Sequence, residues 1–141
     1  MKNALLGILL FVLFLPGAWA CSCMPKTDEQ FARDSDNIYF ATLQEAKLIE
    51  GDGERWPYIK GRFQVQRTLK GKALSTPITL TTNANGASCG QTMVVAATYV
   101  LFLRNGATGL ASCEGARVIE RFQENEFAAK VKATLAKRTA E

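Results

Sequence analysis

The four cysteines place the strongest constraint on how this chain can fold. Cys21 and Cys23 stand at the end of an apolar leader, whereas Cys89 and Cys113 lie far along the sequence. In a secreted domain, four cysteines indicate two disulfides. A Cys21–Cys23 bridge would close a very small, strained ring. The two long-range arrangements are therefore favoured, Cys21–Cys89 with Cys23–Cys113 or Cys21–Cys113 with Cys23–Cys89, and each ties the start of the domain to two distant segments.

Residues 1–20 have the pattern of a signal peptide. Lys2 supplies a positive start, residues 5–15 are almost entirely apolar, and Ala18-Trp19-Ala20 matches the small-x-small pattern of a signal-peptidase site. The apolar run is much shorter than the ~20 residues that span a bilayer as a helix. We therefore expect cleavage after residue 20, a mature chain without a transmembrane segment, and a secreted, periplasmic or extracellular location.

Cleavage after residue 20 would leave Cys21 as the first residue, with a free α-amine. A cysteine in this place is also found in bacterial lipoproteins, where it carries the lipid anchor. Lipoprotein processing favours leucine three residues before the cysteine and a small residue two before it, and Ala18 and Trp19 do not fit. A free amine is the favoured prediction, and a lipid anchor through Cys21 is the alternative.

Size and charge limit the classes of function. Removing residues 1–20 from the 141-residue chain leaves 121 residues, enough for one compact domain over 21–141. The precursor has a net charge of +4, and its basic residues are dispersed rather than gathered in a stripe, which argues against nucleic acid as a partner. We expect a monomer.

Few residues suggest an enzyme. The chain has no histidine, and no nucleophile or phosphate-binding motif is recognisable, so we expect no catalytic activity and no cofactor of its own. A four-cysteine zinc site is disfavoured because Cys89 and Cys113 lack the close C-x₂₋₄-C spacing of structural zinc ligands. A redox-active Cys21-Ser22-Cys23 is disfavoured because no thioredoxin-like βαβ pattern surrounds it.

Periodicity and turn residues predict a mainly β domain with flanking helices. Thr27 and Gln30 form a capping box that starts a short helix over residues 28–33. Phe127, Val131 and Leu135 recur every four residues and predict an amphipathic C-terminal helix over 125–137. Alternating or continuous apolar runs predict five strands, over residues 37–49, 58–69, 78–81, 98–103 and 110–113. The count and the length favour a five-stranded OB-like antiparallel β-barrel, with a two-sheet sandwich as the alternative.

Several motifs together resemble a netrin-like domain, specifically the N-terminal domain of the tissue inhibitors of metalloproteinases. The match covers nearly all of residues 21–138. The motifs are Cys21-Ser22-Cys23-Met24-Pro25, Ile38-Tyr39-Phe40, Phe63-Gln64-Val65, Leu69-Lys70-Gly71, Ser88-Cys89-Gly90 and Tyr99-Val100-Leu101-Phe102. The first and fifth motifs are fairly specific in combination, whereas the strand motifs alone are not. The resemblance implies an OB-like barrel and the disulfides Cys21–Cys89 and Cys23–Cys113.

The resemblance also implies a function, inhibition of zinc metalloproteases. In that family the α-amine and carbonyl oxygen of the first cysteine, here Cys21, chelate the zinc of the protease, and the inhibitor has no metal of its own. Ser22 would enter the primary specificity pocket. The remaining contact residues implied by the family are Cys23, Met24 and Pro25 in the cleft, and Ala87 and Ser88 as a second strip. The alternative is a non-inhibitory netrin-like protein-binding module, in which Cys21 only forms a disulfide.

Overall fold

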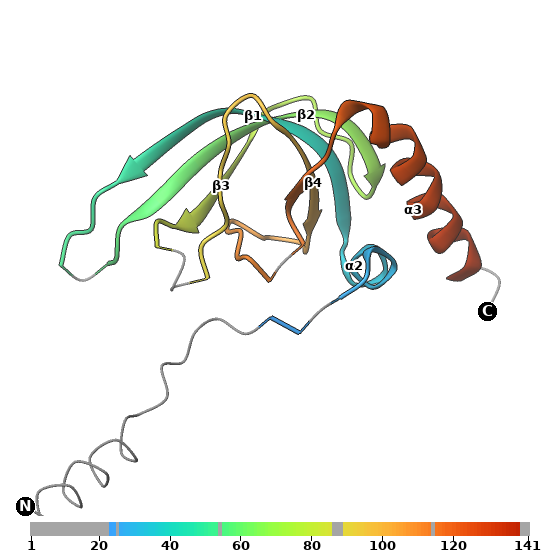
Figure 1. Ribbon diagram of the computed structural model, residues 1–141, viewed down its shortest axis with the longest axis horizontal. Helices are drawn as coiled ribbons and strands as arrows, with labels where there is room; N and C mark the ends of the chain where they lie inside the picture. Colours follow the sequence, from blue (N-terminus) through green and yellow to red (C-terminus); the bar gives the residue numbers. More distant parts are fainter. Residues whose placement is uncertain (1–22, 25, 54, 86–88, 114, 139–141) are drawn as a thin grey trace, which may run out of the picture.

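The computed structural model describes residues 23–24, 26–53, 55–85, 89–113 and 115–138 (Figure 1). The predicted signal peptide and Cys21 lie outside these residues. The elements follow the order α2 (Asp28–Asp34), β1 (Asn37–Ile49), β2 (Tyr58–Lys70), β3 (Ile78–Asn83), β4 (Thr98–Leu103), β5 (Arg117–Val118), the 3₁₀ helix η2 (Arg121–Gln123) and α3 (Glu124–Arg138). In the described part of the chain, no helix is long and apolar enough to cross a membrane.

The five strands form one antiparallel sheet in the order β3-β2-β1-β4-β5. The mainly β prediction is therefore confirmed, with a short helix before the sheet and a longer one after it. The sheet is not closed into a barrel. The edge strand β3 bonds instead to the loop after β4, where the amide of Thr81 donates to the carbonyl of Thr108 at 2.9 Å and the amide of Leu110 donates to the carbonyl of Thr81 at 2.7 Å. The alternative of two packed sheets is not observed, because the strands of the described residues belong to this one sheet.

The fifth strand lies later than predicted. The segment predicted to form it, 110–113, is not a strand: Ala111 forms an isolated bridge with Gly90, and Gly109, just before the segment, forms another with Thr81. Its backbone groups thus face two different segments and cannot form a ladder with either. Gly115, at φ +79°, turns the chain, and the two-residue β5 follows it.

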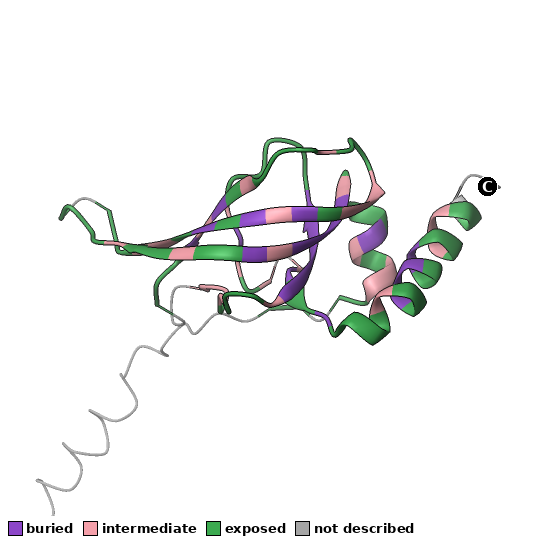
Figure 2. Cartoon of the chain, turned by 90° about the horizontal axis from the view of Figure 1, so that it is seen from above, coloured by how far each residue is buried: buried purple, intermediate pink, exposed green. Residues whose placement is uncertain are grey.

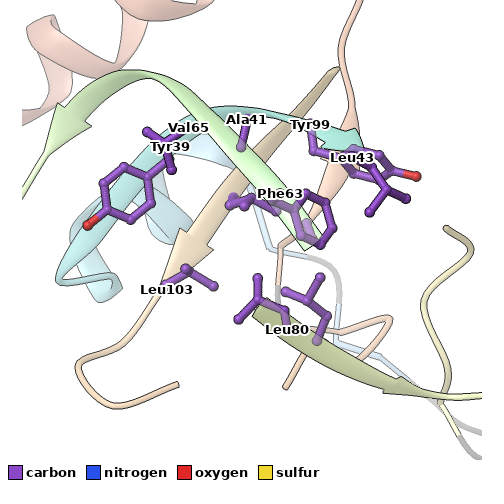
Figure 3. Packing of buried hydrophobic residues seen from close by; sticks show 11 residues of the cluster. Tyr39, Ala41, Leu43, Phe63, Val65, Leu80, Tyr99 and Leu103 are labelled. Atoms are coloured by element: carbon purple, nitrogen blue, oxygen red, sulfur yellow. The ribbon is translucent and has the colours of Figure 1, made fainter. Parts of the chain in front are cut away.

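The first half of strand β1, residues 38–43, is largely buried on both faces, as its apolar sequence predicts, whereas residues 44–49 are exposed or half-buried. Tyr39, Ala41 and Leu43 pack on one face with residues of β2, β3 and β4, including Phe63 and Leu80 (Figure 3). Ile38 and Phe40 pack on the opposite face, under α2 and α3. Figure 2 shows both helices at one end of the sheet, with the β1–β2 turn extending from the other end. Bulges between Phe40 and Ala41 and between Leu43 and Glu45 bend the strand along this stretch.

Both ends of α2 are capped, although only the first cap is visible in the sequence. The Thr27 hydroxyl accepts from the amide of Gln30 at 3.3 Å, and the Gln30 side chain accepts from the amide of Thr27 at 2.7 Å, so the predicted capping box is confirmed. At the other end, the Lys70 ammonium donates to the carbonyls of Ala32, at 2.9 Å, and of Arg33 and Ser35. Lys70 ends β2, so the sheet itself satisfies the last carbonyls of the helix.

The C-terminal helix packs through the predicted stripe. Val131 and Phe127 are buried, Leu135 is partly buried, and the neighbouring Ala128 adds to the contact. The Phe127 ring contacts both Phe40 and Phe102 at centroid distances of 6.0 and 6.1 Å. This helix therefore covers the face of the sheet that carries Phe40 and Phe102, through the stripe that the amphipathic pattern predicted.

Candidate functional site

A disulfide joins Cys23 to Cys113 across 90 residues of sequence, with a Cα–Cα distance of 5.3 Å. This is the pairing that the resemblance implied for these two cysteines. Cys89 is disulfide-bonded as well, and its predicted partner Cys21 lies outside the described residues. The start of the described chain is therefore covalently fixed to the segment that precedes β5.

Hydrogen bonds bring Cys89 beside this disulfide. The amide of Ser112 donates to the carbonyl of Cys89 at 2.9 Å, and Ala111 forms a single antiparallel bridge with Gly90. The Ser112 hydroxyl lies 3.9 Å from the sulfur of Cys23. Three segments far apart in the sequence, at residues 23, 89 and 113, thus meet at one edge of the domain.

The backbone at Cys89 has an unusual conformation. Its φ of 60° is in the left-handed region, which non-glycine residues rarely occupy. The next residue, Gly90, approaches the chain so closely that an added Cβ would lie 2.2 Å from the carbonyl oxygen of Asn83. Only glycine fits this approach. Cys89 and Gly90 therefore both have backbone conformations that few other residues could adopt.

The predicted contact residues divide into two groups. Cys23 and Met24 are described, both are exposed, and the Met24 side chain is 84 % accessible. The others, Cys21, Ser22, Pro25, Ala87 and Ser88, lie outside the described residues. The structure consequently gives the position of the third and fourth residues of the predicted mature chain and of Cys89, which follows the second predicted contact strip.

A cluster of charged side chains fixes α2, the helix that follows these N-terminal residues. The Asp28 carboxylate pairs with the guanidinium of Arg117, and its other oxygen lies 3.9 Å from the Lys130 ammonium. Lys130 also binds Glu29 at 2.9 Å. These contacts tie α2 to β5 and α3. Sequence reasoning missed the cluster, because residues 28, 117 and 130 are charged positions with no spacing that would pair them.

Lys130 lowers the pKa of the Glu29 carboxyl group. The hydrogen bond from the Lys130 ammonium is the largest cause that brings the pKa of Glu29 down from 4.5 to about 2. A carboxylate with a depressed pKa in the folded state stabilises the fold above its unfolded pKa, and this stabilisation disappears as the pH falls toward the folded pKa. Glu29 should therefore stabilise the protein fully above about pH 4.5 and hardly at all near pH 2.

This pH dependence is testable with Glu29→Gln. We expect the variant to melt at a lower temperature than the wild type at neutral pH, with the gap closing between about pH 4.5 and pH 2 as Glu29 takes up its proton. Thermal melts followed by circular dichroism over this range measure the gap. Glu50→Gln, which removes an exposed carboxylate after β1, is the matched control. A gap for Glu29→Gln that does not change with pH would contradict the assigned ion pair.

Among the described residues, no group of three or more histidine, cysteine, aspartate or glutamate side chains is arranged to hold a metal ion. What the described residues of the site present is a crosslinked edge with the exposed residues Cys23 and Met24. No family profile and no curated protein matches this sequence.

Proposed function

We propose that the mature chain is a secreted, netrin-like inhibitor of zinc metalloproteases, whose Cys21 α-amine and carbonyl oxygen bind the zinc of the target. One observation carries the proposal: the Cys23–Cys113 disulfide and the Ser112–Cys89 hydrogen bond lie at the same edge. Cys23, two positions after Cys21, is thereby held close to Cys89, which follows Ser88 in the sequence. Cys23, in the first predicted contact strip, and Cys89, which follows the second in sequence, therefore belong to one crosslinked region.

The strand order is consistent with this family's fold. The order β3-β2-β1-β4-β5 is that of a five-stranded OB-type sheet opened between its third and fifth strands. The loop after β4 partly covers that opening through its bonds to Thr81. We infer that the domain is an open variant of the OB-like barrel implied by the resemblance.

The chemistry of the N-terminus suits a catalytic zinc. An α-amine and a carbonyl oxygen on one residue form a five-membered chelate, and catalytic zinc keeps a coordination position open for added donors. An α-amine with an ordinary pKa of about 7.7–8.0 loses its proton at little cost near neutral pH. The disulfide reduces the conformational freedom of the N-terminal residues before binding, which lowers the entropic cost of the complex.

The proposal is tested by changing only the N-terminal amine. Adding one alanine before Cys21, or acetylating the amine, should weaken inhibition at least about a hundredfold, equivalent to ~2.7 kcal/mol. Inhibition constants are measured with a fluorogenic peptide substrate against a panel of zinc endopeptidases, including matrix-metalloproteinase-type and thermolysin-type enzymes. The control carries the added alanine after Glu141 and should inhibit like the wild type.

The outcomes of this test separate the two functions considered from the sequence. Mass spectrometry of the secreted protein first verifies that it begins with an unmodified Cys21. If the protein with a free Cys21 amine inhibits none of the panel, or if inhibition survives the alanine extension, zinc chelation by Cys21 is wrong. An acylated Cys21 would also overturn it, in favour of a lipid-anchored binding module.

A further inference from the structure

A groove lies at the end of the sheet that is remote from α3, where the β1–β2 turn meets β3. Its volume is about 580 Å³, and its lining includes Arg55, Trp56, Tyr58, Thr81, Asn83 and Leu110. They come from the turn, the start of β2, the end of β3 and the loop after β4. Figure 1 shows the turn projecting at the opposite end of the molecule from α3. The groove therefore belongs to none of the helix contacts described above.

Trp56 presents an aromatic face at this groove. Its side chain is 82 % exposed, whereas Phe40, Phe63 and Tyr99 are fully buried in the core. An exposed tryptophan contributes nothing to the core and leaves a large apolar surface in water. Such a face suits a ligand that stacks flat on the ring.

Polar groups accompany this aromatic face. Tyr58 and Thr81 carry hydroxyls and Asn83 carries an amide, all on the groove lining. The Tyr58 hydroxyl has no hydrogen-bond partner among the residues that the structure describes, whereas the Thr81 hydroxyl donates to the carbonyl of Thr108 at 3.2 Å and can still accept. A sugar ring combines an apolar C–H face with a rim of hydroxyls, and this lining offers a counterpart to each.

The charge of the groove disfavours an anionic ligand. Among the described residues that line it, Arg55 alone is charged. The Arg55 guanidinium is bound to the carboxylate of Asp52 at 3.1 and 3.2 Å. The positive charge is thus already compensated, whereas nucleic-acid sites depend on several cations that contact phosphates. A neutral ligand fits better than a nucleic acid or a sulfated glycan.

The groove is formed before any ligand arrives. The amide of Arg55 donates to the side chain of Asp52 at 2.8 Å, which closes the turn on itself. The amide of Ala84 donates to the carbonyl of Pro57 at 3.1 Å and ties the turn to the end of β3. The backbone on both sides of Trp56 is thus held by hydrogen bonds, which reduces the ordering cost of the turn on binding.

A second hollow adjoins the groove. It measures about 340 Å³, shares Arg55 and Trp56 with the groove, and is otherwise lined by Gly51, Gly53 and Pro57. Two hollows that share one aromatic residue suit a ligand built of repeating units.

We propose that this groove is a binding site for neutral oligosaccharides, in which one sugar ring stacks on Trp56 and its hydroxyls bond to Tyr58, Thr81 and Asn83. The site involves none of the residues assigned to zinc binding. The proposal therefore does not rest on protease inhibition, and either function can fail without the other.

The position of Trp56 makes the site directly observable. Trp19 and Trp56 are the two tryptophans of the sequence, so Trp56 is the only one in residues 21–141. Mature protein is titrated with cellohexaose, N-acetylchitohexaose and maltohexaose as neutral probes, and with a heparin hexasaccharide and hexathymidylate as anionic ones. Stacking of a sugar should shift the tryptophan emission to shorter wavelength with at least one neutral probe, and this shift should persist in 0.5 M NaCl (on the order of a 4 Å Debye length).

Variants then locate the binding by calorimetry, which needs no tryptophan signal. Trp56→Ala should weaken the active neutral probe at least about tenfold, and Trp56→Tyr should recover most of the affinity. The matched control is Phe122→Ala, which removes an aromatic ring of nearly equal exposure, 81 %, on η2. Binding of the anionic probes alone, no binding of any neutral probe, or equal affinities for Trp56→Ala and wild type would each overturn the proposal.

Discussion

Replacing Cys23 and Cys113 together with serine is expected to lower the free energy of unfolding by about 3–4 kcal/mol. The two cysteines are separated by 90 residues of sequence, but Cys89 is also disulfide-bonded, and its predicted bridge to Cys21 remains in the variant. With that bridge in place, Cys23–Cys113 closes a loop of only about 28 residues, which restricts the unfolded chain by about 3.6 kcal/mol at 25 °C in the chain-entropy treatment. For a domain of this size the melting temperature should fall by roughly 10–15 °C. The same change releases Cys23 from its crosslink, so the proposed inhibition should weaken even at temperatures at which the variant remains folded.

Urea denaturation followed by circular dichroism measures this loss. Ser112→Ala is the matched control, because its hydroxyl lies within 4.0 Å of both sulfurs yet makes no covalent bond. It should change the free energy of unfolding by less than about 0.5 kcal/mol, as exposed substitutions usually do. A double serine variant as stable as the wild type would show that the crosslink does not restrict the unfolded chain as assumed.

Phe63→Ala is expected to cost about 3–5 kcal/mol of stability. Phe63 is fully buried on β2, at the centre of the cluster that Figure 3 shows between β1, β3 and β4. Its ring meets that of Tyr99 edge to face at a centroid distance of 5.5 Å. Truncation removes this contact and leaves a cavity that the surrounding strands fill only in part, which accounts for the size of the effect.

The control for this variant is Phe122→Ala, which makes the same chemical change at an exposed ring on η2. We expect it to alter the midpoint of urea denaturation only slightly. The two variants therefore differ only in the surroundings of the deleted ring. A Phe63→Ala protein within about 1 kcal/mol of wild type would mean that Phe63 is not at the centre of the core.

The fold was predictable where apolar residues follow a regular pattern along the sequence. Strand β4 has the predicted bounds, and β1 and β2 agree to within one residue at each end, because long runs of alternating or continuous apolar residues identify strands reliably. The two residues of β5, Arg117 and Val118, are too few to establish any period. Whether the sheet closes depends on which loop bonds to β3, and this is decided by contacts distant in sequence.

The candidate site was predictable only in part. Cysteine spacing left two long-range pairings open, and the observed Cys23–Cys113 bridge agrees with the one that the family resemblance implied. The bonds between Ser112 and Cys89, and between Asp28 and Arg117, join segments that no local pattern relates. The exposure of Trp56 could not be predicted either, because the residues around it in the sequence do not reveal whether a tryptophan beside a turn is buried or exposed.

Lys70, at the end of β2, makes the completion of helix α2 depend on the sheet. Three carbonyl oxygens in the last turn of α2 and just after it accept hydrogen bonds from the ammonium of Lys70, a residue more than thirty positions later. Until β2 is in place, these oxygens must bond to water. The last carbonyls of the helix next to the N-terminal residues are therefore satisfied within the protein only when the β1–β2 hairpin is formed.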